Sequence, residues 1–287
     1  MSAPQQWTTL ELVRWPADFF KQHDVPQARL DAELLLAHTL GCTRMDLYLA
    51  FEKPLNEAER GRYRELVRRR AKERVPVAYL VERREFWSLP FRVTPDVLIP
   101  RPETETLVQV ALDRKPRRAL ELGVGSGCVS GALLRELPDL SIVAVDVSPA
   151  ALELARENLA ALGVLDRVEL VLADGLGDVS GAFDLVVSNP PYVETDTLAG
   201  LAPELRHEPR LALDGGPDGL AAIRQLCAEA PARLERPGWL ALELGQGQAP
   251  VVADLLRAAG AAEVETFPDL AGIARVVLGR FAETENC

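Results

Sequence analysis

The sequence predicts an α/β protein in which a doubly wound, mostly parallel sheet follows a small helical N-terminal domain. Three observations support this prediction. From residue 117 onward, short apolar runs alternate with helical segments, which is typical of repeated β-α-β units. The first 85 residues instead show mainly helical periodicity. The length of 287 residues, with 48% hydrophobic and 26% charged side chains, fits about two ordinary globular domains.

Two helices are clearest in the N-terminal part. Apolar residues recur at helical spacing over Ala28–Leu40, and Gly41 follows as a C-terminal stop. Asn56 and Glu59 have the spacing of a capping box, which begins a second helix that runs to Arg74. Many arginines lie on that second helix, and such a run usually forms a solvated face.

The pattern changes to a short alternating stretch over Phe86–Ile99. Pro90 and Pro95 interrupt this stretch, which favours an extended hairpin or linker. We therefore expect three regions: a helical domain over 1–85, a hairpin hinge over 86–100 and an α/β domain over 101–287.

Seven apolar runs of the third region are expected to be strands, namely Arg118–Leu122, Ser141–Asp146, Val168–Leu172, Phe183–Ser188, Trp239–Leu244, Glu263–Phe267 and Arg275–Leu278. Helices are expected between them, up to Leu137 and over Pro149–Leu162, Leu220–Leu234 and Ala249–Ala259. In an open sheet of this kind, ligands bind at the carboxyl ends of the strands.

Several classes of protein are disfavoured. No run reaches the roughly 18 apolar residues of a membrane span, and the first residues lack the pattern of a secretory signal, so we expect a cytoplasmic protein without a membrane partner. The cysteines and histidines lie far apart in the sequence, which disfavours a disulfide framework, a bound metal and a zinc hydrolase; they are Cys42, Cys128, Cys227, Cys287, His23, His38 and His207.

Negative charge is concentrated in the second part of the chain. Residues 1–100 contain 16 basic and 14 acidic side chains, whereas residues 101–287 contain 16 basic and 29 acidic ones. Because an acidic surface repels phosphate backbones, duplex DNA is disfavoured as a partner.

A glycine-rich turn follows the first strand of the α/β region. It reads Gly123-Val124-Gly125-Ser126-Gly127 and leads into a helix, so the backbone can approach a nucleotide-type ligand closely. The dinucleotide fingerprint G-x-G-x-x-G is absent, because Cys128 and Ser130 stand where its last glycine would be. A glycine turn alone can also be a simple tight connection.

Acidic residues end the next two strands. Asp146 lies 19 residues after Gly127, where a carboxylate can accept hydrogen bonds from a ribose diol. Asp174 and Gly175 follow the third strand and would lie beside an adenine ring. The combination fits S-adenosylmethionine, which has an adenosine but no pyrophosphate. Alternatively, Asp146 could simply cap the helix that starts near Pro149.

The fourth strand ends in Asn189-Pro190-Pro191-Tyr192, the most specific tetrapeptide of the chain. The prolines stop strand pairing and leave the Pro190 carbonyl free to accept a hydrogen bond. A planar amide or aromatic amine is a poor nucleophile until acceptors hold its hydrogens, and the Asn189 oxygen with that carbonyl could hold two. Tyr192 could cover the planar group by stacking. A plain Pro-Pro turn is the alternative.

These segments together resemble the HemK/PrmC family of protein-(glutamine-N5) methyltransferases, over nearly the whole chain. The resemblance is carried by REFWSLPF (84–91), VLIPRPETE (97–105), ELGVGSG (121–127), AVDVSP (144–149), NPPY (189–192) and HEPRLALDGGPDGL (207–220). The stretch NPPY is shared with adenine-N6 DNA methyltransferases, whereas VLIPRPETE is far more specific.

The resemblance implies a helical substrate-recognition domain, a hairpin hinge and a seven-stranded Rossmann-like methyltransferase domain that uses S-adenosylmethionine. It implies that the substrate is the glutamine of the G-G-Q motif of class-1 peptide chain release factors, bound by Asn189–Tyr192. It also implies that Arg101–Glu105 lie near the cofactor pocket, without giving them roles. Three alternatives stay open: a ribosomal-protein glutamine methyltransferase, a DNA adenine methyltransferase, and a binding protein without catalytic activity.

Overall fold

The computed structural model describes residues 8–49, 52, 54–176 and 179–282. This part of the chain forms two compact units. The first comprises the N-terminal residues up to Arg83 together with Ala202–His207, and the second comprises Arg84–Leu201 and the residues from Glu208 onward. Residues 202–207 thus cluster with the helical unit although they are far from it in sequence.

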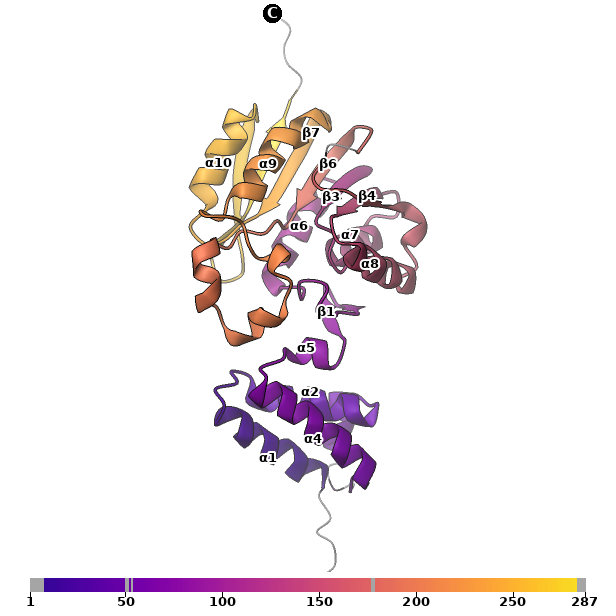
Figure 1. The fold of residues 1–287 in the computed structure, drawn as a ribbon. Coiled ribbons are helices and arrows are strands. Elements are labelled where there is room, and N and C mark those ends of the chain that lie inside the picture. Colours follow the sequence, from indigo (N-terminus) through magenta and orange to yellow (C-terminus); the bar gives the residue numbers. More distant parts are fainter. Residues whose placement is uncertain (1–7, 50–51, 53, 177–178, 283–287) are drawn as a thin grey trace, which may run out of the picture. The chain divides into compact units, whose positions relative to one another are not determined.

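The first unit is built from helices. They are α1 (Thr9–Lys21), α2 (Ala28–Leu40), α3 (Arg44–Leu49), α4 (Glu57–Lys72) and the short α5 (Val77–Leu80), seen in Figure 1 in indigo to purple. The prediction for α2 is confirmed, with Gly41 in the left-handed conformation after it. The predicted capping box of Asn56 and Glu59 is also present, and it begins α4.

Two buried polar groups hold this unit together. The Tyr63 hydroxyl lies 2.9 Å from the Leu12 carbonyl oxygen and 3.0 Å from that of Ala32, so it links α4 to α1 and α2. Arg70 is only 5% exposed and pairs with Asp31 at 2.7 Å. It also pairs with Glu204 at 2.8 Å, which fixes residues 202–207 within the unit. The expectation of a solvated arginine face is therefore wrong for Arg70, which points inward.

We expect Arg70→Met to destabilise the helical unit by about 3 kcal/mol, because it leaves the carboxylate of Asp31 buried without its cationic partner. Two measurements check this loss of stability: urea unfolding of the protein, and the rate of hydrogen exchange of the α2 backbone amides. Arg68→Met is the matched control, because Arg68 is half-exposed and pairs with Glu65 and Glu73 at the surface. Equal stability of the two variants would contradict a structural role for the buried pair.

The second unit begins with the hairpin β1 (Arg84–Phe86) and β2 (Leu89–Phe91), which pair antiparallel. Its turn residues Trp87 and Ser88 both have positive φ, the conformation of a tight two-residue hairpin turn. The Trp87 backbone N–H donates to Glu105 Oε1 at 2.9 Å. Glu105, in the specific VLIPRPETE segment, therefore anchors the hairpin turn.

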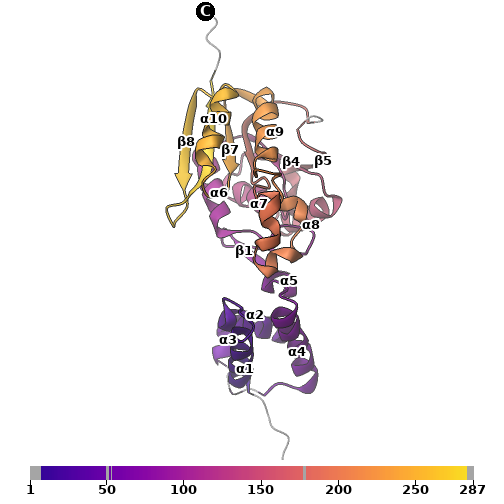
Figure 2. The ribbon, with the colours of Figure 1, turned by 60° about the vertical axis from the view of Figure 1, so that its left-hand side comes forward.

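A seven-stranded sheet forms the centre of the second unit. Its strands are β3 (Arg118–Leu122), β4 (Ser141–Asp146), β5 (Val168–Leu172), β6 (Phe183–Ser188), β7 (Leu234–Glu243), β8 (Glu263–Pro268) and β9 (Ala274–Phe281). Their order is β5-β4-β3-β6-β7-β9-β8, and β9 pairs antiparallel with both β7 and β8, whereas the pairs from β5 to β7 are parallel. Figure 2 shows β5 and β8 at opposite sides of this unit. The predicted doubly wound sheet is confirmed.

Helices cover both faces of the sheet. One face packs against α6 (Glu105–Asp113), α7 (Cys128–Glu136) and α8 (Pro149–Ala161), and the other against α9 (Ala221–Glu229) and α10 (Ala249–Ala258), which lie together in Figure 1. Neighbouring residues of one strand face opposite cores: Ala119 lies in the first cluster and Leu120 in the second. Short 3₁₀ helices connect the elements: η1 (Pro102–Thr104), η2 (Leu165–Arg167), η3 (Thr195–Gly200), η4 (Pro203–His207), η5 (Arg210–Ala212) and η6 (Ala230–Ala232).

Within the described ranges, no helix has the length and apolar character needed to cross a membrane. The same part of the chain contains no cluster of three or more histidine, cysteine, aspartate or glutamate side chains suited to a metal ion.

Candidate active site

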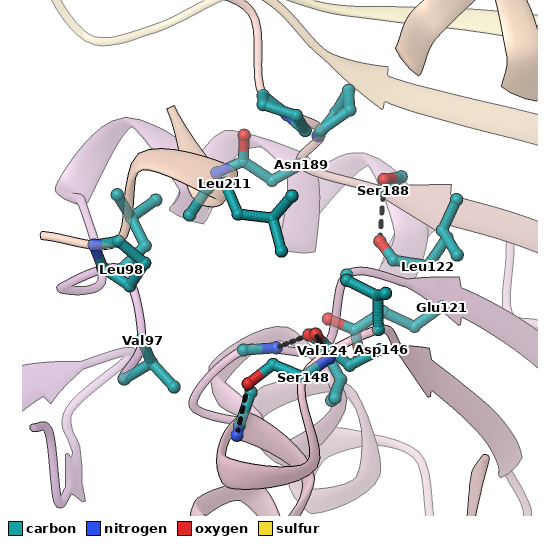
Figure 3. Close-up of a pocket in the computed structure, with 18 of the residues that line it drawn as sticks. Val97, Leu98, Glu121, Leu122, Val124, Asp146, Ser148, Ser188, Asn189 and Leu211 are labelled. Carbon is teal, nitrogen blue, oxygen red and sulfur yellow. Dashed lines mark hydrogen bonds between the residues drawn. The ribbon is translucent and has the colours of Figure 1, made fainter. Parts of the chain in front are cut away.

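The carboxyl ends of the parallel strands β3, β4, β5 and β6 surround one cavity of about 330 Å³. Most of the predicted site residues line it: Gly123, Val124, Gly125, Ser126, Asp146, Asp174, Gly175, Asn189, Pro190 and Pro191. Figure 3 shows Asn189 and Leu211 on one side of the cavity and Val124, Asp146 and Ser148 on the other. Two predicted residues, Gly127 and Tyr192, are not part of the cavity wall.

The glycine turn forms one wall. Gly123, Gly125 and Gly127 all have positive φ, between 52° and 78°, which residues with a Cβ rarely adopt. The backbone N–H groups of Gly123 and Val124 donate to the Val145 carbonyl oxygen at 2.8 and 3.1 Å, which holds the turn against β4. Gly127 lies behind the wall as the N-cap of α7, so its role is to shape the turn.

Asp146 connects the turn to the next helix. Its Oδ2 accepts from the Gly125 N–H and its Oδ1 from the Ser148 N–H, both at 2.9 Å. The helix cap itself is Ser148, whose Oγ accepts from the Ala151 N–H at 3.2 Å. Each carboxylate oxygen of Asp146 retains a lone pair. Asp146 can therefore both hold the turn and accept hydrogen bonds from a diol in the cavity.

Glu121 is a further acidic residue of the wall, and our sequence analysis did not select it. It is 3% exposed, and the Ser130 hydroxyl donates to its Oε2. Burial raises the pKa of the Glu121 carboxyl to about 8, although the Ser130 hydrogen bond opposes the rise. A cationic ligand would favour its charged form. An acidic residue within the buried run Leu120–Leu122 was the signal that could have revealed it.

The hinge segment contributes another side of the cavity, through Asp96, Val97, Leu98, Pro100 and Arg101. A buried carboxylate holds this segment in place. Glu208, 7% exposed, accepts from the Ile99 N–H at 3.1 Å, and its Oε1 pairs with Arg101 Nη2 at 2.5 Å. The distant segments 97–105 and 207–220, both quoted for the family resemblance, therefore meet at Glu208.

The proline motif ends β6 at the cavity. Asn189 Nδ2 donates to Thr104 Oγ1 at 3.2 Å, and the preceding Ser188 hydroxyl donates to the Leu122 carbonyl oxygen at 2.8 Å. Tyr192 turns away from the cavity into the core beside α9 and α10. Its hydroxyl donates to Glu243 Oε1 at 3.4 Å. The motif thus presents an amide and two prolines to the cavity and anchors itself through its tyrosine.

The backbone of the motif is held from behind. Gln248 Nε2 donates to the Tyr192 carbonyl oxygen at 3.1 Å, and the Gly215 N–H donates to the Val193 carbonyl oxygen at 2.8 Å. A Cβ added at Gly215 would lie 2.7 Å from the Pro191 carbonyl oxygen and 2.8 Å from Tyr192 Cα. Only glycine therefore fits against the motif at this position.

We expect Gly215→Ala to lower the rate of the reaction at this site about tenfold, because the added methyl group pushes the Pro191–Tyr192 backbone away from its position. Steady-state kinetics measure the change. Gly200→Ala is the matched control, because a Cβ there meets no atom within 4 Å. If both variants keep the rate of the unmodified protein, the close packing of Gly215 has no functional role.

Comparisons with known proteins agree with this fold. Residues 11–81 match the family model described as PrmC N-terminal domain, and residues 102–216 match the model described as Methyltransferase small domain. A methyltransferase from Pyrococcus furiosus has a similar fold, with a TM-score of 0.53 and 21% identity over 68% of this chain and 90% of that one. The hMettl16 catalytic domain is also similar in fold, with a TM-score of 0.57 and 15% identity over 81% of this chain and 86% of that one.

The doubly wound sheet, the glycine turn and the domain match define the protein as an S-adenosylmethionine-dependent methyltransferase. A protein of Geobacter sulfurreducens named release factor glutamine methyltransferase is 46% identical over 96% of this chain and 98% of its own length. One of Caulobacter vibrioides with the same name is 44% identical over 94% of this chain and 96% of its own length. The chain therefore belongs to the release factor glutamine methyltransferase family.

The chemistry of the cavity suits this cofactor. S-adenosylmethionine contains a sulfonium and an ammonium, both positive, together with a ribose diol and an adenine. The carboxyl groups of Asp146 and Asp174 provide hydrogen-bond acceptors around the cavity, and Glu121 can become negatively charged beside a cationic ligand. The apolar side chains of Val97, Leu98 and Leu211 offer a surface for a flat ring.

Proposed function

We propose that this protein methylates the side-chain amide nitrogen, N5, of the glutamine in the G-G-Q motif of class-1 peptide chain release factors. The names of its full-length relatives support this substrate. The observation that carries the proposal is Asn189 at the cavity edge, followed by two prolines that end strand pairing. Because release factors act on ribosomes, the proposal includes a cytoplasmic location.

The proposed site has two parts. Asn189 and Pro190 hold the amide of the substrate: the Asn189 side-chain oxygen and the Pro190 carbonyl oxygen accept its two N–H groups, and Pro191 keeps the turn rigid. Stacking of Tyr192 on the substrate amide stays a prediction. In this structure the Tyr192 ring packs against the core of the sheet and does not line the cavity. The cofactor contacts are assigned to Gly123, Val124, Gly125, Ser126, Gly127, Asp146, Asp174, Gly175 and Asn189.

Methyl transfer needs no dedicated base in this scheme. When bound, S-adenosylmethionine supplies a methyl group activated by the positive sulfur. The Asn189 and Pro190 oxygens orient the substrate amide so that its nitrogen faces the methyl carbon. The new N–C bond forms as the S–C bond breaks. The nitrogen then loses one proton to water, which leaves a neutral secondary amide and a neutral thioether.

We further propose that the helical unit recognises the body of the release factor. The match of residues 11–81 to the PrmC N-terminal domain model supports a distinct module there. The division proposed from the sequence, 1–85, 86–100 and 101–287, assigns recognition to the first region and catalysis to the third.

The proposal is tested by transfer of labelled methyl groups from S-adenosylmethionine to a panel of acceptors. The panel holds an unmethylated class-1 release factor, the same factor with its G-G-Q glutamine replaced by glutamate, unmethylated ribosomal proteins, and duplex DNA. Label on the intact release factor alone is the expected result. Label on a ribosomal protein or on DNA would show that the substrate is not a release factor. Cofactor binding without any transfer would favour a non-catalytic binding protein.

A further inference from the structure

Asn189 is next to buried polar groups to which our sequence analysis gave no role. Thr104, at the end of η1, is 2% exposed, and Glu243, at the end of β7, is 1% exposed. Asn189 Nδ2 donates to Thr104 Oγ1 at 3.2 Å. The Glu243 carboxyl lies close enough to Thr104 for the hydroxyl to lower the pKa of that carboxyl. Three segments far apart in sequence thus meet directly behind the proposed acceptor of the substrate amide.

The hydrogen that Thr104 donates decides how the side-chain amide of Asn189 is oriented. A hydroxyl has one hydrogen to donate. When Thr104 donates its hydrogen toward the Glu243 carboxylate, its oxygen can only accept, so the side of the Asn189 amide that faces it must be the NH₂ group. Asn189 Oδ1 accepts no hydrogen bond in the described ranges, and it is therefore available to the substrate.

We propose that Thr104 and Glu243 are positioning residues for methyl transfer: the Glu243 carboxylate takes the Thr104 hydrogen bond and thereby fixes the Asn189 amide with its oxygen free for the methyl-accepting amide. This inference rests on the proposed function, because it assigns Asn189 Oδ1 to the substrate. It also gives a role to part of the segment Arg101–Glu105, whose roles the sequence left open.

Glu243 is placed unusually for a purely structural residue. Its Oε2 is buried and has no hydrogen-bond partner among the described residues, which is costly for a carboxyl group. Its surroundings contain Arg275 from β9, which favours the carboxylate, and Glu103 from η1, which disfavours it. The Tyr192 phenol and the Cys128 thiol also face it, and burial raises the pKa of both, so both stay neutral.

The ionisation of Glu243 decides which groups donate and which accept in the series Glu243, Thr104 and Asn189. Burial raises the pKa of its carboxyl to about 7, although Thr104 and Arg275 oppose the rise. Above pH 7 the carboxylate accepts from Thr104, and the Asn189 amide is fixed. Below pH 7 the protonated carboxyl can itself donate to Thr104, whose hydrogen is then free to turn toward Asn189. The amide can then rotate and direct its NH₂ group at the substrate, which stops activation.

The first test compares Thr104→Val with Thr104→Ser. The valine has the same shape but no hydroxyl, so we expect the single-turnover methyl-transfer rate to fall about tenfold, while the Kd for S-adenosylmethionine changes less than about twofold. The serine restores the hydroxyl and should keep the rate within about twofold. A valine variant that transfers methyl as fast as the unmodified protein would overturn the proposal, as would a serine variant as slow as the valine one.

The second test uses pH. The single-turnover rate of the unmodified protein should rise as pH increases through about 7. Glu243→Gln keeps an acceptor for Thr104 but cannot ionise, so its rate should stay flat over the same range. The same rise with pH in Glu243→Gln would show that another group is responsible and would contradict the role of Glu243.

A third measurement needs no methyl acceptor, so that failure of this inference can be told from failure of the proposed function. The side-chain amide signals of Asn189, assigned in NMR spectra by their loss in Asn189→Ala, should shift with an apparent pKa of about 7 and should not shift in Glu243→Gln. Signals that ignore pH in the unmodified protein would refute the coupling. Absence of methylation on release factors, with the NMR shift present, would instead refute only the proposed substrate.

Discussion

Asn189→Ala should lower the single-turnover rate of methyl transfer by roughly 100- to 1,000-fold, the usual loss when one preorganised polar group is removed from a reacting centre. The physical reason is that the substrate amide loses the acceptor that orients its nitrogen and Thr104 loses its donor. Because the glycine turn and the acidic residues at the strand ends still line the cavity in this variant, the Kd for S-adenosylmethionine should rise less than about tenfold.

Rapid-quench kinetics with saturating cofactor measure the rate, and calorimetry measures the Kd. Gln109→Ala is the matched control, since it removes an exposed side-chain amide from α6 whose one partner among the described residues is Asp113. Equal rates for Asn189→Ala and the control would contradict the proposed role of Asn189 in orienting the substrate amide. A loss confined to cofactor affinity would make Asn189 a cofactor ligand only.

Asp146→Ala should raise the Kd for S-adenosylmethionine about 100-fold, with a smaller effect on the rate at saturating cofactor. Hydrogen bonds to a charged acceptor contribute about 1.5–3 kcal/mol each, so the loss of the diol contacts explains such a change. The variant also removes the acceptor of the Gly125 N–H and loosens the glycine turn.

Calorimetric titration with S-adenosylmethionine checks this result. Asp139→Ala offers a control near the opposite end of β4, where the aspartate is exposed and lies outside the cavity. If Asp146→Ala binds the cofactor as tightly as Asp139→Ala does, the carboxylate does not contact the ribose and only shapes the turn.

Several strands of the α/β unit were predictable from their apolar runs. Four of them, from Arg118–Leu122 to Phe183–Ser188, occur with the predicted bounds. Of these, β3, β4 and β6 are largely buried, as is typical of parallel strands covered on both faces, whereas β5 at the edge of the sheet is only partly buried. The start of β7 at Leu234 was missed, because Glu235, Arg236 and Pro237 are polar or cannot pair as ordinary strand residues do. The last helix was predicted to within one residue of α10.

The site was predictable where a polar or acidic side chain lies at the end of a strand or directly after it. Asp146, Asp174 and Asn189 all do so, and parallel strands bring their carboxyl ends together. Thr104 and Glu208 lie in segments quoted for the family resemblance but received no role, and Glu243 was missed, for a common reason. Each acts through a partner far away in sequence, and neither hydrophobic periodicity nor a local motif encodes that partner. The inward turn of Tyr192 was missed likewise, since its partner Glu243 lies on another strand.

Arg70 and residues 202–207 illustrate the same limit in the helical unit. The arginine-rich helix α4 has the composition of a solvated helix, yet Arg70 is buried by Asp31 of α2 and by Glu204. Helical spacing does place Arg70 on the buried face of α4, three residues after Val67 and seven after Tyr63. What the sequence of α4 does not contain is the pair of carboxylates, from α2 and from Glu204, that the tertiary structure brings to this arginine.

The most direct test of the central claim is to locate the transferred methyl group. A class-1 release factor is incubated with the protein and S-adenosylmethionine, and the peptide that contains the G-G-Q motif is fragmented in a mass spectrometer. The account predicts one added methyl group on the side-chain nitrogen of that glutamine, absent when Asn189→Ala replaces the unmodified protein. A methyl group on any other residue, or an unmodified peptide after complete cofactor binding, would contradict it.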